Sequence, residues 1–504
     1  MVKVTRLDSW ASGHNFFKAD GRDMDTRMLA LLLFCLCSQG LSDDGLSENG
    51  NGRSDKIPLV PLIPLVPSLP TEELAPPTSH NTSATQDGPE DSTLFPSPPE
   101  SSEEEEDLKD CGGLASSASA KRAVGGAIMK LGLELLKTLK DSPEQPNTII
   151  SPLSISLALS QLALGAVNET ERLLLHALHA DALPCYHRAL RGLLNQLHGD
   201  ALQVATRLYL KPGFKAKEAF AKESLHMYKS DTVTLAGLEE VNKWVEKATK
   251  GTIPNFLSSL PADLVLMLIN AVHFKGQWEA RFDARFTSKD LFFLSDKEVV
   301  HVDMMLGPKY PLSLLIDAEL DAMVALFPFK QGMSLLVVMP SSGQVNVSAI
   351  GAKLNTTDLY ARLSRPRTMQ VKLPKFKLEY GTELQEALTV MGLGEIFSGP
   401  NLAKIADGYL LVSSVKHKSS MELNEEGAEA AAATSVVISR SNPTFSVNQP
   451  FFFALMDDKT QTPLFLGVVR NPNPEATVMQ IGGSGNPDKL PDKSNGDSFN
   501  HLPK

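Results

Sequence analysis

A stretch near the C-terminus decides the fold, and it reads Glu425-Glu426-Gly427-Ala428-Glu429-Ala430-Ala431-Ala432-Ala433-Thr434-Ser435-Val436-Val437-Ile438-Ser439-Arg440-Ser441. Four consecutive alanines favour a helix, because alanine has the highest helix propensity. Three neighbouring features oppose a helix: Gly427 precedes the alanines, β-branched residues follow them, and Pro443 comes soon after. Small side chains also allow a segment to enter an existing sheet, whose packed faces leave no room for bulky groups. We therefore favour a loop that can become a strand and that presents Arg440, over a helix centred on the alanines.

Several further motifs accompany this loop sequence. They are Ser-Pro-Leu-Ser-Ile at 151–155, Asn-Ala-Val-His-Phe-Lys-Gly-Gln-Trp at 270–278, Leu-Pro-Lys-Phe at 373–376, Asn-Gln-Pro-Phe at 448–451 and Leu-Phe-Leu-Gly at 464–467. Together with the Glu-Glu-Gly and alanine-rich segment, they make residues 113–474 resemble the serpin family. The resemblance implies an α+β serpin fold, in which helices pack around a large central, mostly antiparallel β-sheet with additional sheets and an exposed reactive loop.

The pattern of apolar residues agrees with an α+β class. Helical spacing runs from Val124 to Leu139, and residues 153–166 are apolar on nearly every side, which predicts a buried helix. Residues 202–210 alternate like a strand, and residues 241–248 read as an amphipathic helix. After residue 263 the chain becomes rich in strand-like segments, and helices followed by strands indicate a mostly antiparallel sheet.

The regions on either side of this domain differ from it in composition. Residues 28–40 form a short apolar run that follows Arg27 and ends in small residues, which is typical of a secretory signal. Met24 is a plausible start, so we assign residues 1–40 to an upstream extension plus signal peptide. Residues 41–112 are rich in Ser, Pro, Asp and Glu, which predicts a disordered acidic tail. We interpret residues 475–504 as a flexible C-terminal tail that ends in a lysine.

Cysteine and asparagine positions agree with secretion. Cys35 and Cys37 leave with the signal, and Cys111 and Cys185 remain. An even pair in an oxidising compartment predicts one disulfide, although two buried thiols are the alternative. A serpin branch that inhibits plasmin has its cysteines placed in much the same way. Glycosylation sequons begin at Asn81, Asn168, Asn346 and Asn355.

The sequence contains no recognisable catalytic or metal-binding motif. It lacks a Gly-x-Ser-x-Gly elbow, a His-Glu-x-x-His pair, a phosphate loop and, beyond the signal, a Cys-x-x-Cys pair. We expect His273, His417, Trp244 and Trp278 to be core residues rather than catalytic groups or ligand platforms. No metal or cofactor is predicted, and we expect the protein not to be an enzyme.

The serpin resemblance implies an inhibitor that serine proteases attack as a substrate. The protease would form an acyl bond at Arg440, and the cut loop from Gly427 to Arg440 would insert into the central sheet as an extra strand. A hinge of small residues would permit that insertion. We assign it to Glu426, Gly427, Ala428, Glu429, Ala430, Ala431, Ala432, Ala433 and Thr434.

Arginine before the cut bond selects trypsin-like proteases, because a guanidinium pairs with a carboxylate through two hydrogen bonds. Trypsin, plasmin, thrombin and the kallikreins all satisfy that requirement. The usual serpin count from Gly427 places the cut after Ser441, but the branch that inhibits plasmin shares the shorter spacing with an arginine. We therefore assign the reactive bond to Arg440–Ser441.

The C-terminal tail suggests a second contact with the protease. Lys489, Lys493 and the terminal Lys504 lie in a polar segment, and a terminal lysine presents the paired charges that kringle domains bind. The expected partners are plasmin and other trypsin-like proteases, with plasminogen kringles bound through the tail. The protein would thereby regulate fibrinolysis and blood coagulation.

Charge and hydropathy also bear on other functions and partners. The formal net charge of −11 argues against nucleic acid, and no apolar run is long enough to span a bilayer. We expect a secreted monomer. The alternatives are a non-inhibitory carrier or signalling serpin, an inhibitor of another arginine-specific protease such as thrombin or a kallikrein, and an enzyme. Few basic residues lie near Arg188 and Arg191, which argues against a heparin-dependent thrombin inhibitor.

Overall fold

The computed structural model describes residues 111–481, except for residues 112, 114, 140, 141, 143, 198, 199 and 427–442. The chain divides into two units, and all described residues belong to the second, Pro96–Lys504. The first unit, the signal sequence, most of the acidic tail, the reactive loop and residues 482–504 therefore lie outside the described residues. None of the described helices is both long enough and apolar enough to cross a membrane.

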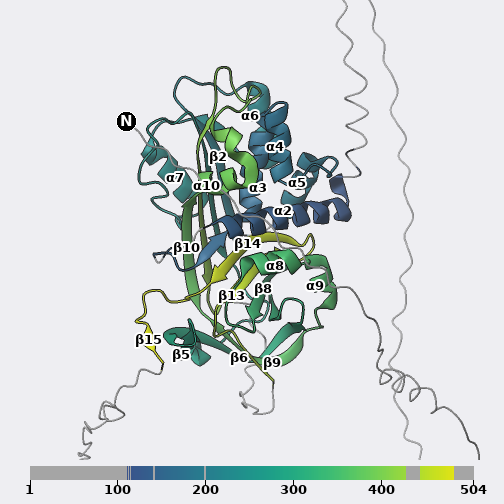
Figure 1. The fold of residues 1–504 in the computed structure, drawn as a ribbon, viewed down its shortest axis with the longest axis vertical. Helices are drawn as coiled ribbons and strands as arrows, with labels where there is room; N and C mark the ends of the chain where they lie inside the picture. The colour runs from purple at the N-terminus through teal and green to yellow at the C-terminus, as the bar shows by residue number, and fades with distance from the viewer. Residues whose placement is uncertain are drawn as a thin grey trace, which may run out of the picture. The chain divides into compact units, whose positions relative to one another are not determined.

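Helices dominate the first part of the described chain (Figure 1). They are α2 (Ala118–Thr138), α3 (Pro152–Gly165), α4 (Glu169–Ala177), α5 (Tyr186–Leu194), α6 (Glu218–Tyr228) and α7 (Leu238–Ala248). Helix α3 begins at the N-cap Ser151, with Pro152 in its first turn, where a missing N–H has no cost. Almost every residue of α3 is buried, as the apolar pattern predicts.

One of the two sheets has five strands and leads into the predicted reactive loop. Its order is β10 (Phe376–Glu383), β11 (Val412–Leu423), β4 (Leu266–Lys275), β2 (Leu202–Leu210) and β3 (Thr232–Thr234). The pairs β10–β11 and β4–β2 are antiparallel, whereas β11–β4 and β2–β3 are parallel. This sheet is therefore mixed, and β11 and β4 are neighbours although far apart in sequence.

The second sheet has ten strands. Its main path is β1 (Thr148–Ile150), β14 (Thr462–Val469), β13 (Phe451–Asp457), β8 (Met333–Pro340), β7 (Ala322–Phe329), β6 (Glu298–Asp317), β9 (Arg367–Pro374) and β12 (Thr444–Ser446). Strands β5 (Ser288–Phe293) and β15 (Met479–Gln480) also pair with β6. The described fold also contains the short helices α8 (Val347–Lys353), α9 (Thr356–Arg362) and α10 (Gln385–Leu388), and the helical turns η1 (Ala284–Phe286), η2 (Thr389–Leu393) and η3 (Gly394–Phe397).

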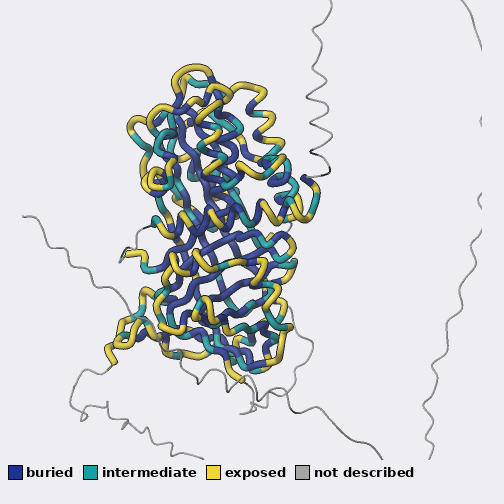
Figure 2. Tube along the Cα trace, turned by 45° about the vertical axis from the view of Figure 1, so that its right-hand side comes forward, coloured by how far each residue is buried: buried dark blue, intermediate teal, exposed yellow. Residues whose placement is uncertain are grey.

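Two hydrophobic cores lie on opposite faces of the five-stranded sheet. The larger core includes Leu268 and Val272 of β4 together with α2, α3 and the second sheet. The smaller core lies under α7, where Val241 and Val245 pack against Met267 and Ile269. These β4 residues alternate between the two cores, as the two-residue period of a strand requires. Figure 2 shows the sheets as a buried interior beneath exposed loops.

One prediction about the chain's organisation needs correction, and one strand was not predicted. The expected C-terminal tail starts at residue 475, but the fold continues to Ile481. Met479 and Gln480 pair with Val299 and Glu298, and the Ile481 amide donates to the Lys297 carbonyl over 2.7 Å. The physical reason is that the edge of β6 offers backbone groups that a short strand can satisfy. The long strand β6 was not predicted at all.

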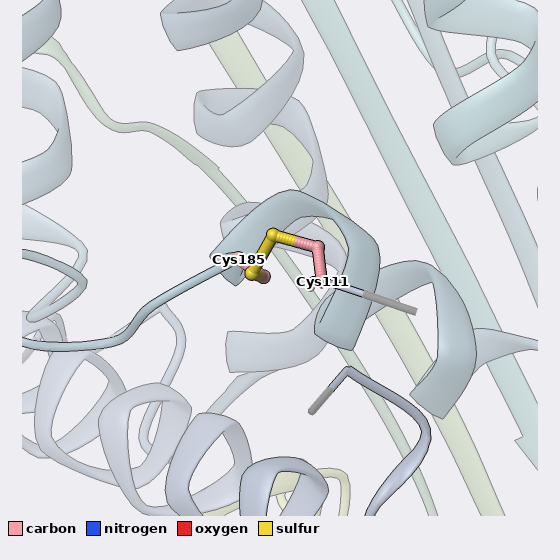
Figure 3. Close-up of a disulfide and its surroundings, with 2 residues drawn as sticks. All are labelled: Cys111 and Cys185. Atoms are coloured by element: carbon pink, nitrogen blue, oxygen red, sulfur yellow. A yellow bond between two sulfur atoms is a disulfide. The ribbon is translucent and has the colours of Figure 1, made fainter. Parts of the chain in front are cut away.

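A disulfide joins Cys111 to Cys185 and thereby fixes the start of the described chain to the residue before α5 (Figure 3). The two Cα atoms lie 5.7 Å apart, and the cysteines are separated by 74 residues in sequence. This is the pairing that the sequence predicts. A cross-link over so long a loop restricts the unfolded chain considerably.

Removing this cross-link should destabilise the protein. We expect the double substitution Cys111→Ser with Cys185→Ser to lower the free energy of unfolding by about 4 kcal/mol, on the chain-entropy account of disulfides. Denaturant titration under non-reducing conditions measures the change. As a control, a reducing agent should lower the stability of the unsubstituted protein and leave that of the double variant unchanged; equal stability of both proteins would contradict the expectation.

Candidate functional site

The candidate site is the parallel pairing of β4 with β11, which we call the seam. The register runs from Val412 opposite Leu266 to Glu422 opposite Lys275. The described chain leaves β11 at Leu423 and reaches Glu426, and after residues 427–442 it returns at Pro443 just before β12. A segment that turned back after β11 and entered the seam would run antiparallel to both β11 and β4.

Buried polar side chains cross the middle of the seam. His417 of β11 lies opposite Asn270 of β4, and the distance from His417 Nδ1 to Asn270 Oδ1 is 2.7 Å. The backbone N–H of Ser151 donates to His417 Nε2 over 3.3 Å. Ser154 Oγ donates to Asn270 Oδ1 over 2.8 Å, and Asn270 Nδ2 donates to the Ser154 carbonyl over 2.6 Å. The network thus links both strands to the first turn of α3.

These contacts define the charge state of His417. Its Nε2 accepts a hydrogen bond, so the proton sits on Nδ1 and the ring is neutral. Burial lowers the pKa of His417 to about 3, because a charged imidazole is poorly solvated there. His273, which contacts Ser420 across the same seam at 3.2 Å, has a pKa lowered mainly by burial. Both histidines are core residues, as predicted.

At the loop end of the seam, charged groups and one tryptophan hold the chain. Lys275 of β4 pairs with Glu422 of β11 at 3.2 Å and approaches Glu426 at 3.6 Å. Trp278 donates from Nε1 to the Asn424 carbonyl over 2.7 Å, and its backbone N–H donates to the Glu426 carbonyl over 3.0 Å. The first residue of the predicted hinge, Glu426, is therefore anchored.

Glu425, the residue before Glu426, is also anchored by side-chain contacts. Lys375 forms an ion pair with it at 2.9 Å, and Thr287 Oγ1 donates to it over 2.8 Å. Burial alone would raise the pKa of Glu425, but the hydrogen bonds from Lys375 and Thr287 outweigh burial and lower it. Trp278 itself stacks on Phe329, with ring centroids 4.1 Å apart, so the anchor rests on a packed aromatic cluster.

The far end of the loop is fixed by backbone contacts. Gln370 N–H donates to the Pro443 carbonyl over 2.9 Å, and β12 continues parallel to β9 from Thr444. Both ends of residues 427–442 are thus tied to the framework. The predicted hinge residues after Glu426, together with Arg440 and Ser441, lie outside the described residues, as do the tail lysines Lys489, Lys493 and Lys504 and the sequon at Asn81.

The remaining sequons are on the surface. Asn168, Asn346 and Asn355 are all exposed. Asn346 and Asn355 cap α8 and α9 through Oδ1, which accepts from Ala349 N–H and Asp358 N–H. A glycan attaches to Nδ2, so it is compatible with both caps.

Sequence reasoning overlooked most of the residues that anchor the loop. Lys275, Lys375 and Thr287 were given no role, although the first two lie in the segments 270–278 and 373–376 that carry the resemblance.

The two tryptophans that were predicted to be core residues differ in burial. Trp278 is buried, whereas Trp244 is only partly buried and stacks on the Arg207 guanidinium, 4.1 Å from the ring centroid. In the part of the chain that the structure describes, no group of three or more His, Cys, Asp or Glu could hold a metal ion.

Comparison with known proteins identifies the class. The profile of the family described as "Serpin (serine protease inhibitor)" matches residues 126–472. The chain is 41% identical to alpha-2-antiplasmin of Bos taurus, over 74% of this chain and 77% of that protein. It is 42% identical to alpha-2-antiplasmin of Mus musculus, over 71% and 74%. The chain therefore belongs to the serpin family.

Other relatives and solved structures agree with this fold. Pigment epithelium-derived factor of Homo sapiens is 30% identical over 69% of this chain and 87% of that protein. The crystal structure of uncleaved ovalbumin matches with a TM-score of 0.64 at 27% identity, over 69% of this chain and 100% of that chain. Mouse protein-Z dependent protease inhibitor matches with a TM-score of 0.62 at 26% identity, over 71% and 100%.

The buried histidine of the seam should make stability depend on pH. An unfolded histidine titrates near pH 6.5, and folding lowers the pKa of His417 to about 3. The neutral ring therefore contributes its full stability above pH 6.5, and this contribution falls by about 1.4 kcal/mol per pH unit as the pH drops towards 3. Equilibrium unfolding at several pH values measures this dependence.

The matched variant is His417→Asn. Subtracting its stability curve from that of the unsubstituted protein removes the contributions of other titrating groups, such as Asp458, whose pKa burial raises to about 6. The difference should shrink between pH 6.5 and 3. Parallel curves over that range would show that His417 is not a buried neutral group.

Proposed function

We propose that the chain is a secreted suicide-substrate inhibitor that traps plasmin, and other trypsin-like proteases, by cleavage of the Arg440–Ser441 bond. The observation that carries the proposal is the seam, where two parallel strands lie next to each other and one of them leads directly into the candidate loop. Membership of a family of serine protease inhibitors supports the same function.

The chemistry would begin as ordinary proteolysis. The serine of the protease attacks the carbonyl carbon of Arg440, and the amine of Ser441 leaves. Residues up to Arg440 are then attached to the protease through an ester and to β11 through Glu425 and Glu426. The free end would enter the seam before water hydrolyses the ester, and the protease would be carried along and distorted.

The lengths of the two segments are compatible. Strand β11 has 12 residues and spans roughly 40 Å at 3.3 Å per residue. Residues 427–440, when extended, span roughly 45 Å by the same measure. The alanines of the hinge carry little bulk, so either face of the new strand would pack against existing cores.

Insertion would remove the parallel pairing. One parallel ladder would be replaced by two antiparallel ladders, which adds backbone hydrogen bonds and makes reversal slow. The small-residue hinge favours an inhibitory serpin over a non-inhibitory carrier or signalling serpin, because bulky hinge residues would hinder insertion.

Specificity would come from Arg440 and from the tail. A guanidinium at the cut bond suits a protease pocket with an acidic base. Two alpha-2-antiplasmins are 41% and 42% identical to this chain, which supports plasmin over thrombin or a kallikrein as the main target, and fibrinolysis as the process regulated. Lys489, Lys493 and Lys504 would add contacts with kringles.

Secretion forms part of the proposal. It is supported by the signal-like residues 28–40, by the disulfide between Cys111 and Cys185, and by the exposed sequons. Disulfides persist in oxidising compartments. We propose glycosylation at Asn81, Asn168, Asn346 and Asn355.

Incubation with plasmin tests the function. We expect a complex that survives denaturing electrophoresis and a released peptide whose N-terminus is Ser441, because the ester is trapped before hydrolysis. The variant Arg440→Ala should lose complex formation with plasmin and with trypsin by at least tenfold in rate. The matched control Arg470→Ala lies outside the loop and should leave both rates unchanged.

Each other outcome has a definite meaning. Cleavage at Arg440 without a stable complex would mean a substrate or carrier serpin and would overturn the inhibitory proposal. Trapping of trypsin but not of plasmin would keep the mechanism and remove plasmin as the target. A new N-terminus at Asn442 would move the reactive bond to the position of the usual serpin count.

A further inference from the structure

The hydroxyl of Tyr310, in β6, is buried and has no hydrogen-bond partner among the described residues. Only 2% of the residue is exposed. Four other buried side chains carry a polar atom without a partner, yet each makes a polar contact through a second atom; they belong to Gln203, Arg207, Glu240 and Asp317. In Tyr310 the hydroxyl is the only polar group of the side chain, so nothing compensates for its burial.

Aromatic packing holds the ring of Tyr310 in place. The ring stacks on Phe282, with centroids 4.8 Å apart and planes 17° from parallel, and Phe327 packs beside it at 5.8 Å. Gly307 permits this arrangement, because a Cβ there would lie 3.1 Å from Tyr310 Cβ and 3.2 Å from Phe282 Cε1. The hydroxyl therefore cannot turn towards water unless its packed neighbours move.

The hydroxyl of Tyr310 is a donor that lacks an acceptor. Burial and, to a smaller extent, the negative charge of Glu279 raise the pKa of Tyr310, so the hydroxyl keeps its proton at neutral pH. In the unfolded chain this group donates to water, and its burial without an acceptor destabilises the native state. Native proteins contain few such groups, and stored strain is one physical reason to retain one.

The rings around Tyr310 contact both ends of the reactive loop. Phe327, which touches Tyr310, also packs against Trp278 at 6.2 Å, and Trp278 Nε1 donates to the Asn424 carbonyl just before the loop. Phe327 packs as well against Phe445 of β12, where the chain has returned from the loop, with ring centroids 6.3 Å apart. One ring thus separates Tyr310 from the contacts that hold each end of the loop.

We propose that the Tyr310 hydroxyl stores strain in the native state, that loop insertion relieves this strain, and that Tyr310 thereby favours trapping of the protease over simple cleavage. When the cut loop enters the seam, the chain moves beside Trp278, and the aromatic rings repack so that the hydroxyl donates to a carbonyl or carboxylate oxygen. Tyr310 acts through the framework and does not touch the protease. The inference rests on the proposed function, because it concerns the insertion step.

The substitution Tyr310→Phe removes the hydroxyl and keeps the ring. We expect it to raise the unfolding temperature of the intact protein by about 2 °C or more, because the donor without an acceptor is gone. A protease that cleaves after Val436 or Val437 cuts the loop of both proteins. In the cut form the gain should vanish or reverse, since the hydroxyl then has a partner. Calorimetry of the full chain in both forms measures these shifts.

Tyr209→Phe is the matched control. Tyr209 is also fully buried, but its hydroxyl donates to Glu240 Oε1 over 3.3 Å. Removal of a hydroxyl that has a partner should lower the unfolding temperature of the intact protein. The two tyrosines should therefore give shifts of opposite sign.

The partition between trapping and cleavage is the functional measurement. With plasmin, we expect Tyr310→Phe to raise the share of protein that is cut at Arg440 without a stable complex, by about twofold or more. The reason is that a more stable native state slows insertion relative to hydrolysis of the ester. Denaturing electrophoresis of the two products measures this share.

Two results would overturn the proposal. If intact Tyr310→Phe is no more stable than the unsubstituted protein, the hydroxyl has a partner in the native state, such as a buried water. If the gain is equal in the intact and cut forms, insertion does not relieve the strain. Calorimetry needs no plasmin, so it decides on Tyr310 even if neither protein traps plasmin, a result that would count against the proposed function alone.

Discussion

The parallel pairing of β4 with β11 is the constraint on which the rest of the structure depends. Antiparallel pairs dominate elsewhere in the described fold, whereas these two parallel neighbours can part to accept one strand that runs antiparallel to both. The chain that follows β11 is the segment best placed to become that strand. On the proposed mechanism, the native state lacks a ladder that forms only after the loop is cut.

Side chains as well as the backbone ladder keep the seam closed. His417, Asn270 and Ser154 form a buried network in its middle, and Lys275 bridges to Glu422 at its loop end. The contacts from His417 to Asn270 and from Lys275 to Glu422 join the two strands that must separate before a strand enters, and Ser154 ties Asn270 to α3. A buried polar network is costly when only partly satisfied, so it favours a seam that is either fully closed or fully open. The contacts of Glu425 and Glu426 hold the end of β11, and on the proposed mechanism the cut loop would turn directly after them.

Particular residues show how much of this the sequence could predict. The all-round apolar pattern after Ser151 and Pro152 predicts buried helix α3, and strict alternation at 202–210 predicts β2, because both signals are local. Strand β6 escaped prediction because Gly307, Pro308 and Pro311 interrupt its sequence; the structure accommodates Pro308 at an irregularity between Gly307 and Tyr310, whereas Pro311 pairs with Thr368 of β9. The pairing of Ser414 with Met267 has no local signal at all. Neither do the contacts of Lys375 and Thr287 with Glu425, which arise only when distant strands meet.

The central claim is that the seam accepts the cut loop as a strand. The most direct measurement compares the unfolding temperature of intact protein with that of protein cut once within the loop, by a protease that cleaves after Val436 or Val437. The account predicts a clear rise after cutting, because the freed segment adds backbone hydrogen bonds to the sheet. The rise should vanish in a variant with Ala431→Glu and Ala432→Glu, since neighbouring residues of a strand face opposite sides and one charge would be buried. An unfolding temperature that stays the same or falls after cutting the unsubstituted protein would contradict the account.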